Sequence, residues 1–162
     1  MLSRCVPAAI LLTAAVITWA APAAGAAPGA QGLDPLLGTA YAQAAQSARA
    51  EGVPLRITSG KRSVAEQQHL WRQAIATYGS PGAARQWVLP PNESTHVTGR
   101  AIDVGPRDGA LWLERNGFRW GLCRTFTNEW WHFEVVTVPG VRCPPMWPNA
   151  AVRADHRRRG GI

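Results

Sequence analysis

The chain has 162 residues, a formal net charge of +7 at pH 7 and a 46% share of hydrophobic residues. This length suits one domain with a single core. No internal repeat occurs, and beyond the N-terminus no apolar stretch is long enough to span a membrane.

The first 26 residues are typical of an export signal. Arg4 supplies the short positive region, an apolar run covers residues 6–21, and Ala24-Gly25-Ala26 has the small residues that signal peptidase accepts. We therefore predict a signal peptide at 1–26, with an uncleaved N-terminal anchor as the alternative. The mature protein is expected to be secreted or held in the cell envelope, with no stable membrane span after cleavage.

The mature chain stays basic, because Arg4 is the only charge that cleavage removes from the formal +7. Outside the cytoplasm this charge favours anionic cell-wall polymers as partners, and export argues against nucleic acid. Four arginines near the C-terminus are expected to form a solvated end: Arg153, Arg157, Arg158 and Arg159.

Two cysteines remain after the signal, which carries Cys5. Cys123 and Cys143 form an even pair in an oxidising compartment, so we predict a disulfide between them. A Cys/His metal site is the alternative, but neither cysteine belongs to a CxxC pair.

The first half of the mature chain contains two helix signals. Residues 27–33 are expected to be a flexible leader. Asp34 and Pro35 then predict a helix that runs to about Ala50, and 55–58 alternate like a short strand. Ser63 and Glu66 form a capping box that opens a second helix, which ends near residue 78.

The second half has weaker signals. Residues 79–93 are expected to be a functional loop, 101–104 and 131–136 strands, and 109–116 a helix. Irregular order of helices and strands predicts an α+β fold with a small, largely antiparallel sheet flanked by helices. The domain is expected at 34–145, followed by a basic irregular tail at 146–162.

The strand at 131–136 carries a polar face. Alternation predicts that Trp131, Phe133 and Val135 enter the core, while His132 and Glu134 point the other way. A polar pair on an aromatic strand needs partners, because burying it unpaired is costly. Glu134 is expected either at the surface or as an acceptor for the neighbouring histidine.

The stretch 94–104 is also expected to have a core face and a polar face. Ile102 and Val104 can enter the core while Asp103 faces the opposite side, and Gly99 permits a turn that brings His96 back toward Asp103. Two imidazoles and a carboxylate suit Zn²⁺, and three protein ligands leave a fourth position for water. We therefore predict a catalytic zinc site of three ligands: His96, Asp103 and His132.

The residues alone also permit plainer interpretations. His132 could be a hydrogen-bonded core histidine, and Asp103 could pair with Arg100 or Arg107. Glu129, three residues before His132, is predicted to lie on a turn that returns to the metal and to act as the general base. His69 is expected to have no role in the site.

These motifs resemble a known family. The pattern Ser94-x-His96-x2-Gly99-x-Ala101-x-Asp103, followed by Glu129-x2-His132, is similar to that of the zinc D-alanyl-D-alanine carboxypeptidases and dipeptidases of the vancomycin-resistance type. The resemblance extends over about 55–136. It implies a bacterial enzyme in which the His, Asp and His bind zinc and the Glu is the base. It also implies a small α+β fold shared with the hedgehog signalling domain.

The resemblance adds residues that composition and spacing do not single out. Ser59-Gly60-Lys61-Arg62-Ser63-x3-Gln67 is similar to the family's Ser-Gly-Tyr-Arg-Ser…Gln segment. It implies that Arg62 steadies the scissile carbonyl and that Gln67 and Ser94 contact substrate. Lys61 stands where the family commonly has Tyr, a departure that bears on substrate preference.

The leading hypothesis is therefore a monomeric, zinc-dependent D-Ala-D-Ala carboxypeptidase that acts on peptidoglycan stem peptides. An endopeptidase that cuts inside the stem (L-Ala-D-Glu) or the cross-bridge is the alternative within the enzyme class. A non-catalytic, zinc-stabilised wall-binding module is the alternative outside it, because one fold can serve several functions. An extracellular anion-binding protein would leave the His/Asp/Glu arrangement unexplained.

Overall fold

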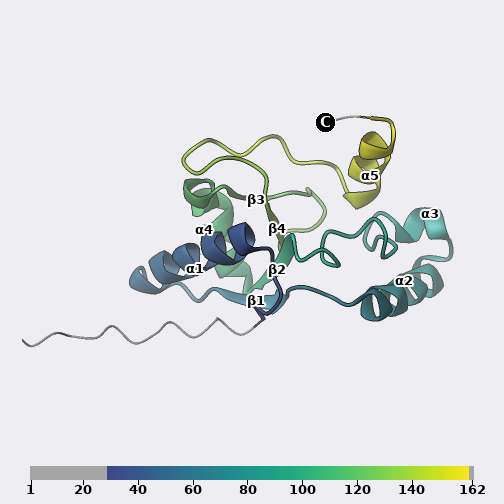
Figure 1. The fold of residues 1–162 in the computed structure, drawn as a ribbon, viewed down its shortest axis with the longest axis horizontal. Helices are drawn as coiled ribbons and strands as arrows, with labels where there is room; N and C mark the ends of the chain where they lie inside the picture. The colour runs from purple at the N-terminus through teal and green to yellow at the C-terminus, as the bar shows by residue number, and fades with distance from the viewer. Residues whose placement is uncertain (1–28, 161–162) are drawn as a thin grey trace, which may run out of the picture.

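The computed structural model describes residues 29–160 and has a four-stranded sheet at its centre (Figure 1). All three strand pairs are antiparallel, in the order β1-β2-β4-β3. The strands are β1 (Arg56–Ser59), β2 (Ala101–Gly105), β3 (Leu122–Arg124) and β4 (His132–Val135). The expected α+β fold with a small antiparallel sheet is confirmed.

The helices begin where the sequence places their caps. Asp34 accepts a hydrogen bond from the Leu36 amide at 3.0 Å, and Ser63 and Glu66 form the reciprocal capping box. The helices are α1 (Pro35–Ala50), α2 (Val64–Tyr78), α3 (Pro81–Ala84), α4 (Arg107–Asn116), the 3₁₀ helix η1 (Gly117–Trp120) and α5 (Ala150–Arg158).

The main core lies on one face of the sheet, under α1 and α4. Figure 1 shows these two helices together on one side, with α2 and α3 on the other. Phe133 is fully buried in this core, and the helices contribute Leu37, Tyr41 and Leu113. The sheet contributes one side chain in every two along each strand: Ile57, Ile102, Val104, Leu122 and Phe133.

The strand register places polar residues together on the opposite face. Ile102 pairs with Phe133 on the core face, so the next pair along, Asp103 and His132, lies directly across β2 and β4 on the other face. A bulge in β1 between Ile57 and Ser59 shifts the register, and Ser59 thereby becomes the partner of Asp103.

Trp131 was expected in the core, and this prediction is wrong. β4 begins only at His132, and the two residues before it form a turn, so alternation does not extend back to Trp131. Trp130 packs against the main core instead, and Trp131 lines the cavity on the polar face.

The prediction of a basic irregular tail at 146–162 is also corrected, because this segment contains the helix α5. Asn149 accepts a hydrogen bond from the Val152 amide and opens α5. Ala150 and Ala154 pack with Leu89 and Phe126 in a second, smaller core. Arg153, expected in a solvated end, is buried on the inner side of this helix.

The other differences between the sequence predictions and the structure are smaller. The leader expected at 27–33 is not free where the structure describes it, since Ala30 and Leu33 pack against the main core. The loop expected at 79–93 contains the single turn α3, and β3 was not foreseen from sequence. The predicted signal peptide lies outside the described residues. Among residues 29–160, no helix is long and apolar enough to cross a membrane.

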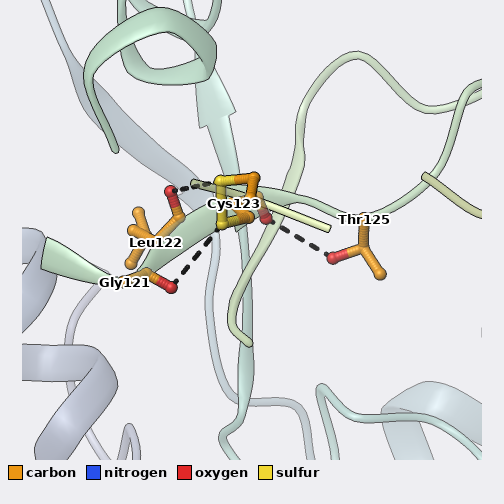
Figure 2. The surroundings of a disulfide bond; sticks show 5 residues. Gly121, Leu122, Cys123 and Thr125 are labelled. Atoms are coloured by element: carbon orange, nitrogen blue, oxygen red, sulfur yellow. Dashed lines mark hydrogen bonds between the residues drawn. A yellow bond between two sulfur atoms is a disulfide. The ribbon is translucent and has the colours of Figure 1, made fainter. Parts of the chain in front are cut away.

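The predicted disulfide between Cys123 and Cys143 is present (Figure 2). It joins β3 to the segment that leads from β4 to α5, with a sequence separation of 20 residues. Further along, Trp147 pairs with the chain beside Phe126 through backbone hydrogen bonds with Thr125 and Thr127. The segment before α5 is therefore attached to the sheet at two points.

Replacing both cysteines by alanine should lower the free energy of unfolding by about 3 kcal/mol, because the bridge restricts a loop of this length in the unfolded chain. Chemical denaturation of the two proteins measures the difference. A reductant should destabilise the natural chain and leave the double variant unchanged; equal sensitivity would contradict a stabilising bridge.

Candidate metal centre

Three potential metal ligands converge on the polar face of the sheet. His96 Nε2, His132 Nδ1 and Asp103 Oδ1 lie 3.3 Å from one another in each of the three pairs. All three residues are buried, and among residues 29–160 they form one group that could hold a metal ion. Asp103 and His132 come from neighbouring strands, and His96 comes from the turn before β2.

The ring of His96 is oriented by the backbone of the segment after β1. Its Nδ1 lies 2.9 Å from the Gly60 carbonyl oxygen. Since a carbonyl only accepts, Nδ1 carries the proton and Nε2 keeps its lone pair. The Arg62 amide donates to the His96 carbonyl at 3.1 Å, which fixes the two segments together.

The ring of His132 is oriented by Glu134, two residues along the same strand. His132 Nε2 lies 2.9 Å from Glu134 Oε1, so Nε2 donates, and in the neutral ring the Nδ1 lone pair points toward Asp103. Burial alone would raise the pKa of Glu134, but the His132 contact and the charge of Arg153 hold that pKa well below its ordinary value.

The two oxygens of Asp103 have different environments. Oδ2 accepts a hydrogen bond from Arg62 Nη2 at 2.7 Å. Oδ1 is buried and has no hydrogen-bond donor among the described residues. One carboxylate oxygen is thus neutralised by an arginine, and the other is directed at the two histidine lone pairs.

This arrangement fits a tetrahedral cation such as zinc. Ligand atoms about 2.0–2.1 Å from a tetrahedral zinc lie roughly 3.3–3.4 Å apart, which matches the three distances. Three lone pairs at this separation repel one another, and a bound cation would remove that repulsion. A bound cation would also account for Oδ1 of Asp103, which is buried and has no hydrogen-bond partner among the described residues.

Glu129 lies beside this group but outside the triangle. Its Oε2 is 3.7 Å from His132 Nδ1, and its Oε1 is buried with no partner among residues 29–160. Burial raises the pKa of Glu129 to about 7. The turn at 130–131 permits this approach, as expected from its odd spacing to His132.

Arg62 is held by three partners. Its Nε donates to Ser59 Oγ at 2.9 Å, Nη1 to Gln67 Oε1 at 3.1 Å and Nη2 to Asp103. Gln67 is only 1% exposed, and its amide nitrogen donates to the Leu89 carbonyl. Gln67 therefore connects Arg62 to the loop before the metal group.

A cavity of about 350 Å³ opens over the group. Ser94 and Trp131 line it beside the ligands, and the loop expected to be functional supplies Trp87, Val88 and Leu89. The side chains of Tyr78 and Trp87 stack with ring centroids 6.1 Å apart. The predicted site residues Arg62, Gln67, Ser94, His96, Asp103, Glu129 and His132 all line this one cavity.

Two residues at the site were not foreseen. Ser59 reaches Arg62 because of the β-bulge, which leaves no mark in the sequence. Arg153 reaches Glu134 because α5 folds back over the sheet. Asn149 was an available helix-start signal, but nothing in the local sequence distinguishes Arg153 from its exposed neighbours.

Residues 31–137 match the family model described as VanY, D-alanyl-D-alanine carboxypeptidase. A D-alanyl-D-alanine carboxypeptidase of Enterococcus faecalis is 30% identical over 118 residues, covering 57% of this chain and 44% of the relative. The chain thus spans less than half the length of that relative.

Two solved structures illustrate the similarity of fold. A mutant of the vancomycin-resistance D,D-pentapeptidase VanY, in complex with Zn(II), is 26% identical with a TM-score of 0.60, covering 65% of this chain and 74% of that one. The LD-carboxypeptidase LdcB is 22% identical with a TM-score of 0.58, covering 77% and 64%.

The turn that delivers His96 depends on Gly99. Its φ is +71°, and an added Cβ would lie 2.6 Å from the Gly32 carbonyl oxygen. Gly99→Ala should therefore lower stability by more than the about 1–2 kcal/mol that a left-handed alanine costs. Gly79→Ala is the control, because Gly79 has φ +78° and open space around it. Equal losses in thermal unfolding would contradict a steric role for Gly99.

Proposed function

This chain belongs to the VanY family of D-alanyl-D-alanine carboxypeptidases, and from this premise we propose that it is a zinc peptidase that removes the terminal D-alanine from peptidoglycan stem peptides. One observation carries the proposal. Three converging ligand atoms and a separate buried carboxylate, Glu129, share a single cavity.

The proposed cofactor is Zn²⁺, held by His96, Asp103 and His132. The ligand set, its spacing and the Zn(II) bound by the VanY relative support this choice. When bound, zinc supplies a Lewis acid for the scissile carbonyl and lowers the pKa of a coordinated water.

Glu129 is the proposed general base. It is close to one ligand atom but not among the three, and one of its oxygens has no partner among the described residues. From this place it can take a proton from the attacking water and return it to the leaving amine. A wall-binding module would have no use for a buried carboxylate here, so Glu129 favours turnover over binding alone.

Arg62 is the proposed electrostatic stabiliser of the carbonyl oxygen. Ser59, Gln67 and Asp103 hold its guanidinium from three directions, so little reorganisation is needed when negative charge develops. Each terminal nitrogen has a second N–H besides the one it donates, and Arg62 lines the cavity. Ser94 is proposed to contact the substrate beside it.

The site of action is proposed to be the cell wall. The predicted signal peptide and the basic mature charge support export to an anionic polymer. Which bond is cut follows from the fit of the stem in the cavity, and relatives of this fold include an LD-carboxypeptidase.

The mature chain, loaded with zinc, should release one D-alanine from a pentapeptide stem that ends in D-Ala-D-Ala. Mass spectrometry of the products measures this, with a chelator-treated sample and a tetrapeptide stem as controls. Release from the tetrapeptide alone would indicate L,D specificity, and larger fragments would indicate an endopeptidase. If no wall peptide is cut despite stoichiometric zinc, turnover is refuted.

Two variants should distinguish the role of the general base from that of a metal ligand. Glu129→Gln should retain zinc and lower kcat by about 10²–10⁴-fold, because it removes only proton transfer. His132→Ala should lose zinc, measured by metal analysis after gel filtration. The matched control is His69→Ala, an exposed histidine on α2, which should change neither quantity. Full activity of Glu129→Gln would refute the base assignment.

A further inference from the structure

The helix α5 carries a buried arginine to the rear of the metal centre. Arg153 is 4% exposed, and its Nη2 donates to Glu134 Oε1 at 2.7 Å. This contact joins residues 19 apart in sequence. It lies behind His132, away from the three ligand atoms.

Glu134 Oε1 collects three donors. Thr95 Oγ1 donates at 2.9 Å, His132 Nε2 at 2.9 Å and Arg153 Nη2 at 2.7 Å. A buried carboxylate with only neutral donors is costly, so the guanidinium offsets the charge that Glu134 presents to His132. Partners of this kind fix the tautomer and the orientation of a ligand histidine.

Arg153 also supports the ring of His132 through an aromatic neighbour. Its guanidinium lies over the Phe126 ring, 4.5 Å from the centroid. The Phe126 and His132 ring centroids are 4.9 Å apart. The arginine thus contacts both Glu134 and Phe126, which in turn contact the imidazole.

The helix that carries Arg153 is firmly attached. Its inner alanines pack on Leu89 and Phe126, and Asp155 forms an ion pair with Arg85 at 2.9 Å. The disulfide and the Trp147 backbone pairing anchor the segment before it. α5 lies beyond residues 31–137, the part that matches the family model.

We propose that Arg153 is a positioning residue for the metal centre. Acting through Glu134 and Phe126, it holds the His132 imidazole in the tautomer and orientation that direct Nδ1 at the cation. The inference rests on the proposed function, since it takes His132 to be a metal ligand. It assigns to the C-terminal helix a role in metal affinity beyond stabilising the fold.

The test compares zinc affinity among variants, measured by competition with a chromophoric chelator. Arg153→Met keeps much of the side-chain volume and removes the charge, and it should weaken zinc binding by about 10–100-fold. Arg153→Lys should restore part of the loss. Arg159→Met is the matched control at the C-cap of the same helix, because Arg159 is exposed and forms no ion pair among residues 29–160; the zinc affinity of this variant should be unchanged.

A double-mutant cycle distinguishes positioning from a general loss of structure. If Arg153 acts through Glu134, Arg153→Met should add little to the zinc-affinity loss of Glu134→Gln. Full additivity, or natural affinity in Arg153→Met, would overturn the proposal. Thermal unfolding of each metal-free variant verifies that it folds. If Arg153→Met does not fold, Arg153→Lys replaces it in the comparison.

The two proposals fail in different ways. A natural chain that binds no zinc refutes the proposed function, and with it this inference. A natural chain that binds zinc tightly while Arg153→Met binds it equally well refutes only the role of Arg153.

Discussion

The pairing of Asp103 with His132 across β2 and β4 is the constraint on which the rest of the site depends. The same register buries Ile102 against Phe133 on the other face, beneath α1 and α4. A slip by one residue would move the histidine into the apolar core and Phe133 into the cavity. The hydrophobic effect, acting on one face of the sheet, therefore aligns the two strand-borne ligands on the other.

The ligand atoms are directed by the partners of their other polar atoms. Gly60 binds the far nitrogen of His96, Glu134 binds that of His132, and Arg62 binds the far oxygen of Asp103. Each partner leaves one lone pair facing the same point. Because the group is buried, the three atoms are costly without a cation and well organised for one. Rigid supports of this kind are what a hydrolytic metal centre requires, since its geometry is set before substrate arrives.

Much of the fold and of the site was predictable from the sequence, and the predictions that failed did so for physical reasons. The caps at Asp34 and Ser63 located two helices, and alternation around Asp103 and His132 separated a core face from a polar face. Alternation failed at Trp131, where a turn precedes the strand. Ser59 depends on a bulge, and Arg153 depends on where a terminal helix docks. Both are tertiary effects, which local patterns do not encode. The roles assigned to the seven predicted site residues stay predictions, although the fold gathers all of them around one cavity.

The proposed zinc site is defined by particular atoms as well as by residues. A crystal structure of the zinc-loaded protein, with anomalous data collected at the zinc edge, tests it most directly. The account predicts one anomalous peak about 2.0–2.2 Å from His96 Nε2, Asp103 Oδ1 and His132 Nδ1, with Glu129 outside the coordination sphere. A peak at another group, or coordination through His132 Nε2 with its bond to Glu134 broken, would contradict it.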